Sequence, residues 1–96
     1  MIITPIDIMA FIARSARISL DDMRGRLKPR HYVRARAVFA MVMRERGASF
    51  TQIGKLLHKD HSTIVHAVHT FEERYANDET AKEMLDYARH EFLEPA

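Results

Sequence analysis

Apolar residues recur at helical spacing along most of the chain, and caps, glycines and prolines divide them into segments. Thr4 is a helix-capping residue, Pro5 suits the first helical position, and Asp7 places a carboxylate in the first turn. The apolar stripe that follows predicts a helix to about Ala16. A serine and a glycine bracket a second, short helix within residues 19–25.

The middle of the chain predicts a basic connector and then a long, buried helix. Residues Arg26 to His31 form the connector, because Pro29 disfavours helical backbone at Lys28. A helix is predicted from about Tyr32 to Arg46. Since it is apolar nearly all round beyond its first turn, we expect it to be the central helix, ending at Gly47.

The second half predicts two short helices and a closing one. Ser49 and Gln52 fit a capping box ahead of a helix of about two turns. Asp60 opens the next helix, which we expect to run on so that one face carries Ile64, Val68, Phe71 and Tyr75. A final helix follows Asn77-Asp78, with the stripe Ala81, Met84, Leu85, Ala88 and Phe92. The fold class is therefore all-α with five to six helices, in a single domain over 1–96 whose core includes Phe39, Val42, Ile53, Ile64, Val68 and Phe71.

Composition narrows the functional classes. A chain of 96 residues that is 47% hydrophobic suits one domain with one core. It has no cysteine, which excludes disulfides, thiolate metal sites and cysteine nucleophiles. The N-terminus lacks a signal-peptide pattern and no apolar run is long enough to span a bilayer, so we expect a cytoplasmic, nucleoid-associated protein with no membrane partner.

The net charge of +2 says little about binding partners, but the distribution of charge along the chain is more informative. From Arg14 to Lys59 there are twelve Lys and Arg residues against three carboxylates, whereas from Glu72 onwards eight carboxylates face three cations. A basic middle suits a polyanion. We interpret the acidic end as a solvated helix face.

The candidate chemistry lies between Ser49 and Glu73, where a capped short helix, a turn and an amphipathic helix follow one another. Two short helices joined this closely are typical of a helix-turn-helix, which we place at about 50–76. The second helix of such a pair puts its first residues into the major groove of DNA. Its outward residues are Asp60, His61, Ser62, Thr63 and His66, which offer acceptors, hydroxyls and a methyl group to base edges.

The run Asp60-His61-Ser62-Thr63-Ile64-Val65-His66-Ala67-Val68, preceded by Ile53-Gly54, resembles the signature of the C-terminal DNA-binding domain of the bacterial replication initiator DnaA. The order of the expected helices resembles that domain over nearly the whole chain. The resemblance implies a Trp-repressor-like helical fold and double-stranded DNA as the partner.

The resemblance also implies roles for individual residues. Asp60, His61 and Ser62 would meet base edges, and Thr63 a phosphate. Lys28 would enter the adjacent minor groove from the basic connector, alongside Arg26 and Arg30, which we expect to bind phosphates. The remaining implied contacts are Phe50 and Thr51 near thymine methyl groups, and Arg34, Arg36 and Lys59 near the backbone.

Three departures alter the expected selectivity. Ser62 replaces the usual threonine, Lys28 replaces an arginine, and His58 replaces a turn glycine. An ammonium is more strongly hydrated than a guanidinium and so is a poorer occupant of a narrow minor groove. No P-loop of the form G-x-x-x-x-G-K-[ST] occurs in these residues, so we expect neither nucleotide binding nor ATP hydrolysis.

The same residues allow other interpretations. Asp60 is also a preferred N-cap, and its lone pairs allow both roles. A zinc site is disfavoured because cysteine is absent and His66 and His69 are angled differently from His58 and His61. Tyr32 and Phe39 fit a core better than a base-stacking platform, and His61-Ser62 is no catalytic dyad.

We therefore expect no enzyme activity, no cofactor and no metal. Two functions remain. One is sequence-specific DNA binding at DnaA-box-like sites, as a transcription regulator or as a competitor of replication initiation. The other is a protein-interaction module that uses the same helical surface. A monomer is favoured, and the oligomeric state stays open.

Overall fold

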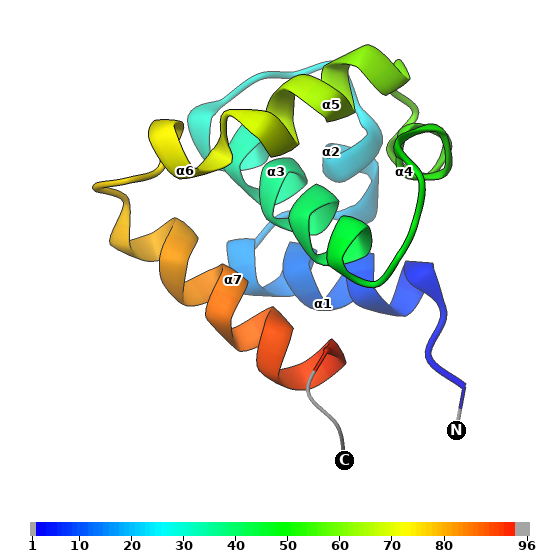
Figure 1. Cartoon of the computed structure of the whole chain (residues 1–96), viewed down its shortest axis with the longest axis horizontal. Coiled ribbons are helices and arrows are strands. Elements are labelled where there is room, and N and C mark those ends of the chain that lie inside the picture. Colours follow the sequence, from blue (N-terminus) through cyan, green and yellow to red (C-terminus); the bar gives the residue numbers. More distant parts are fainter. Residues whose placement is uncertain (1, 94–96) are drawn as a thin grey trace.

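The computed structural model describes residues 2–93, and all regular structure in that range is helical (Figure 1). In chain order the helices are α1 (Pro5–Ala16), α2 (Leu20–Arg24), α3 (Arg30–Glu45), α4 (Phe50–Leu57), α5 (His61–His69), α6 (Phe71–Arg74) and α7 (Glu79–Phe92). The all-α prediction is confirmed. The described chain has more helices than the five to six predicted, because α6 is a separate turn of four residues.

Capping boxes begin three of the helices. In each, the hydroxyl of the cap residue accepts a hydrogen bond from the N–H three residues later, and that residue's side chain accepts from the N–H of the cap. The three pairs are Thr4–Asp7, Ser19–Asp22 and Ser49–Gln52. These boundaries agree with the sequence-based prediction because each signal lies within four consecutive residues.

Two boundaries differ from the prediction. α3 begins at Arg30 rather than Tyr32, since the constraint of Pro29 acts on the residue before it and leaves the following backbone free to be helical. α5 ends at His69 instead of continuing through Tyr75. The Thr70 hydroxyl donates to the main-chain oxygen of His66 at 2.7 Å, a bond that bends helices.

α3 is the central helix, as predicted. It packs against α1 and α7 on one side and against α4 and α5 on the other (Figure 1). Its residues Val38, Phe39 and Val42 are fully buried. The predicted core residues Ile53, Ile64 and Phe71 are buried as well, whereas Val68 is only half-buried and lies at the edge of the core.

Polar contacts fasten α7 to α3. The Arg89 guanidinium holds both carboxylate oxygens of Glu45, with contacts at 2.8 Å. Asp78 caps α7 by accepting from the N–H of Ala81 and also faces the Arg34 guanidinium at 3.4 Å. α1 and α7 thus close one side of the molecule, and α4 and α5 stand on the other (Figure 1).

Candidate nucleic-acid interface

The turn between α4 and α5 is tight and depends on two unusual backbone positions. His58 adopts the left-handed conformation, with φ 57° and ψ 43°, where other helices often end in glycine. The N–H of Lys59 donates to the Gly54 oxygen at 2.8 Å. A Cβ on Gly54 would lie 2.7 Å from the Lys59 main-chain oxygen, so only glycine allows this approach. The two helices are consequently held in one fixed relation.

The start of α5 presents the signature residues to solvent. Asp60, His61, Ser62 and Thr63 are all exposed, while Ile64 is buried and anchors the helix against α3. Asp60 occupies the N-cap position, but its side chain makes no capping hydrogen bond. The carboxylate therefore retains its acceptor capacity for a ligand.

The loop between α2 and α3 carries exposed cations. Arg26, Lys28 and Arg30 are exposed, and so is Leu27 between the first two. A guanidinium or ammonium in such a position remains available to phosphates. The sequence-predicted loop cations thus lie where a polyanion can reach them.

Two other predicted contacts, Arg36 and Lys59, are turned towards the protein. Arg36 is only 9% exposed, and its guanidinium donates to three main-chain oxygens at the end of α2, those of Met23, Asp22 and Gly25. The Lys59 ammonium donates to the Arg24 and Gly25 oxygens at 3.0 and 2.7 Å. Sequence reasoning placed Arg36 and Lys59 at the DNA backbone, but these bonds engage them with the end of α2, whose last carbonyls lack partners within the helix.

Arg34 and Phe50 are half-buried. Arg34 pairs with Asp78, the cap of α7. Phe50 lies beneath the Arg44 guanidinium, 4.4 Å from the ring centroid, and meets the His69 ring edge-on at 6.0 Å. Thr51, next to it, is exposed, as is His66 on α5.

Burial and charge shift two of these groups. Burial lowers the pKa of Lys59, and the neighbouring charges of Arg36 and Arg26 lower it further. Burial also lowers the pKa of Arg36, and the charge of Asp22 acts in the opposite direction. Cations are therefore crowded beneath the loop, which makes the region strongly electropositive.

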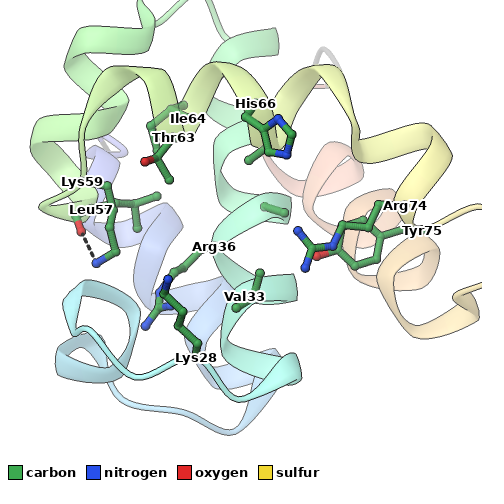
Figure 2. Close-up of a pocket in the computed structure, with 12 residues that line it drawn as sticks. Lys28, Val33, Arg36, Leu57, Lys59, Thr63, Ile64, His66, Arg74 and Tyr75 are labelled. Atoms are coloured by element: carbon green, nitrogen blue, oxygen red, sulfur yellow. Dashed lines mark hydrogen bonds between the residues drawn. The ribbon is translucent and has the colours of Figure 1, made fainter.

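A cavity of about 510 Å³ opens between α3, α5 and α6 beside this region (Figure 2). Its floor is apolar and includes Val33 and Ile64. Its polar lining is Lys28, Arg36, Lys59, Thr63, His66, Arg74 and the Tyr75 side chain, so no acidic residue is among the described residues that line it. A second hollow, of about 640 Å³, shares Lys28, Arg36 and Lys59 with the first, and its other lining residues lie at the end of α2, in the α2–α3 loop and at His58. We call the two hollows together the basic groove.

The family described as the bacterial dnaA protein helix-turn-helix matches residues 5–70. The chain belongs to this family. The DnaA helix-turn-helix family consists of helical DNA-binding domains, and its helix-turn-helix corresponds here to α4, the turn and α5. The resemblance stated from the sequence is thereby confirmed.

A replication initiator protein is similar over most of the chain. The chromosomal replication initiator protein DnaA 1 of Chlamydia pneumoniae is 29% identical over 73 residues, which is 75% of this chain. The chain spans only 16% of the length of that relative.

The DnaA helix-turn-helix match ends at residue 70, before Arg74. Sequence reasoning did not single out Arg74, because it sits between carboxylates in the acidic end of the chain. Its place at the cavity became visible only in three dimensions. Within residues 2–93, no helix is long and apolar enough to cross a membrane, and no cluster of side chains is arranged to hold a metal ion.

Proposed function

We propose that this chain binds double-stranded DNA at sites resembling DnaA boxes. The start of α5 enters the major groove, and the α2–α3 loop reaches the adjacent minor groove with Lys28. The 96 residues act as one domain, and a monomer is the binding unit. Membership of a DNA-binding family supports the general activity, and the signature at Asp60 supports the type of site.

One observation carries the proposal. Asp60, His61, Ser62 and Thr63 are exposed together at the N-terminus of a nine-residue helix, and the Asp60 carboxylate makes no capping hydrogen bond. A carboxylate accepts from cytosine or adenine amino groups, and serine and threonine hydroxyls serve either sense. This set of groups suits base edges rather than phosphates, which would repel the carboxylate.

The phosphate contacts come from exposed cations. Arg26 and Arg30 flank Lys28 on the loop, and Thr63 adds a hydroxyl from α5. Thr51 and the Phe50 ring lie at the start of α4, on the side of the thymine methyl groups. Arg34, Arg36 and Lys59 act mainly through the fold, since each is engaged with main-chain oxygens or with Asp78.

The biological consequence is occupancy of initiator-type sites. A protein that fills such a site excludes other proteins that recognise the same sequence. It therefore acts as a transcription regulator where the site lies in a promoter, or as a competitor of initiation where the site lies in an origin.

Selection of bound sequences from random duplex DNA tests the proposal. We expect a recurrent site of the DnaA-box type, together with binding that weakens steeply as salt rises. His61→Ala should lose the selected sequence while the melting temperature stays close to that of the wild type. Absence of any enriched sequence, with salt-insensitive retention of a protein partner, would favour the protein-interaction alternative.

A further inference from the structure

Arg74 is an exposed cation without a described role. It is the last residue of α6, and its guanidinium lies over the Tyr75 ring, 5.8 Å from the centroid. It forms no ion pair with any residue between 2 and 93. Figure 2 shows its side chain directed into the cavity from the side opposite Lys59. The neighbouring carboxylates Glu72 and Glu73 do not line this cavity.

Thr63, Ala67 and Arg74 follow one another along the same side of α5 and α6, since all three line the cavity. Lys28 faces them from the loop across its mouth (Figure 2). The row starts near the beginning of α5, passes the bend at Thr70 and ends at the last residue of α6. Groups spread over two helices match a stretch of backbone better than a single anion.

We propose that the cavity between α5–α6 and the loop is the seat of the DNA strand that separates the two grooves, and that Arg74 binds a phosphate of this strand. The proposal rests on the proposed function and extends it beyond the matched residues 5–70. With α5 in the major groove and Lys28 in the adjacent minor groove, one phosphodiester strand must cross between them. Among residues 2–93, Lys28 of the loop and Thr63 of α5 line the same cavity, so the basic groove offers the strand a surface between these two elements.

Charge supports this seat. The pKa of Lys59 is lowered by burial and by the like charges of Arg36 and Arg26, and none of the carboxylates in the described part of the chain lines the cavity to offset them. A phosphate placed above these cations favours the charged form of Lys59. Arg74 and Lys28 are exposed and supply accessible charges at the two edges of the cavity.

Salt titrations of the full chain on a duplex containing the selected site give the first test. Arg74→Ala should make the slope of log affinity against log salt shallower by about 0.9. When salt rises fourfold, the fold-loss of affinity should then be smaller for the variant than for the wild type by a factor on the order of three. Arg74→Lys should restore the slope, because an ammonium also neutralises a phosphate. Arg14→Ala, an exposed cation on α1 away from the cavity, is the matched control and should leave the slope unchanged.

A phosphate scan locates the contact. Single methylphosphonate replacements, which neutralise one phosphate each, are measured with the wild type and with Arg74→Ala. We expect one position on the strand between the grooves to weaken wild-type binding but not that of the variant. If every replacement weakens the binding of the wild type and of Arg74→Ala by the same factor, the role of Arg74 is overturned.

Two outcomes separate this inference from the proposed function. If the wild type binds no duplex with salt dependence, the proposed function itself fails. If Arg74→Ala binds DNA like the wild type but loses thermal stabilisation by inorganic pyrophosphate, the cavity holds a small anion and the DNA seat is overturned.

Discussion

The Lys59 ammonium lies 3.0 Å from the main-chain oxygen of Arg24, and the Arg24 side chain returns a hydrogen bond of 2.9 Å to the main-chain oxygen of Leu56. Lys59 thus donates to the last main-chain oxygen of α2, and Arg24 donates to a main-chain oxygen near the end of α4. The exchange joins the end of α2, and with it the basic loop, to the turn of the helix-turn-helix. A cation that stands beside the signature aspartate in sequence therefore contacts the scaffold in the folded chain.

Lys59→Met tests this assignment. The substitution leaves main-chain oxygens at the end of α2 without their donor, and we expect the free energy of unfolding to fall by about 1–3 kcal/mol. Urea denaturation measures the change. Lys55→Met, at an exposed position on α4, is the control and should stay within about 0.5 kcal/mol of the wild type. A stable Lys59→Met protein whose salt slope of DNA binding has dropped would instead identify Lys59 as a phosphate contact.

Asp60 offers a test of base recognition that is nearly free of stability effects. Because its side chain makes no capping bond, Asp60→Ala should destabilise the protein by less than the roughly 1 kcal/mol typical of a lost cap. Ser49→Ala, which removes a formed cap, should show that full loss. Both Asp60→Ala and Asp60→Asn should weaken binding to the selected site by about 1–3 kcal/mol.

The measurement for Asp60 is paired, with melting temperature first and then affinity for the selected site and for a scrambled duplex. Non-specific affinity should stay constant or rise, since a negative charge has been removed near phosphates. Retention of discrimination by Asp60→Asn would show that His61 and Ser62 carry the recognition alone.

His58→Gly should stabilise the protein. His58 has φ 57° and ψ 43°, a conformation that strains a side chain bearing a Cβ but not glycine. We expect a gain of about 0.5–1 kcal/mol in urea denaturation, because the greater freedom of glycine in the unfolded chain offsets part of the relief. Arg17→Gly is matched to it, with φ 58° and ψ 43° at the end of α1, and should show a similar gain. Loss of stability in both variants would contradict the strain argument.

Features that depend on residues close together in the sequence could be predicted from it. The capping boxes involve residues three apart, and the predicted starts of α1, α2 and α4 are correct. The bonds of Arg36 and Lys59 to the end of α2 span 11 to 35 residues, and nothing near either residue in the sequence distinguishes a cation that holds a carbonyl from one that holds a phosphate. The break at Thr70 was missed because the apolar spacing of Phe71 and Tyr75 continues across it, and both are indeed buried.

The candidate site shows the same division between local and long-range features. The exposed start of α5 follows from a local motif and a local helix boundary, so the sequence could place it. The place of Arg74 at the cavity could not be predicted from the sequence, because its position relative to Lys28 depends on how α6 turns after Thr70 and on the path of the loop. Long-range placement of charge requires the folded chain.

Lys28→Ala tests minor-groove recognition. If Lys28 enters the minor groove, the variant should lose preference for A·T pairs at one end of the selected site, since that groove distinguishes mainly A·T from G·C. Competition binding with duplexes changed at that end measures the preference. Arg34→Ala removes a side chain that pairs with Asp78, and this variant should keep the preference for A·T pairs. An equal, sequence-independent loss in both variants would reduce the loop to a general electrostatic contact.

Acid should destabilise the protein through its capping carboxylates. Hydrogen bonds from the Ser19 main chain and side chain, the Tyr32 hydroxyl and the charge of Arg36 hold the pKa of Asp22 below its ordinary value of 3.8, although partial burial opposes them. The pKa of Asp7 is lowered in the same way by Thr4. Their contribution is present above pH 3.8 and is lost as pH falls through the lower pKa of the folded state.

Urea midpoints measured from about pH 5 to pH 2 should therefore decrease, and the decrease should be shallower for Asp22→Asn than for the wild type. Asp21→Asn, at the exposed neighbouring position, should follow the wild-type profile. A profile for Asp22→Asn that coincides with the wild type would remove Asp22 from the acid response.

The hydrogen bonds between Lys59, Arg24 and Leu56 also hold the start of the loop at a fixed distance from the recognition helix. One inserted base pair moves two points on a duplex apart by about 3.4 Å and rotates them by roughly 35°. A rigid pair of contacts cannot follow that displacement. If α5 and Lys28 occupy neighbouring grooves as proposed, the protein tolerates changes of base within its site more readily than changes in the number of base pairs between the two contacts.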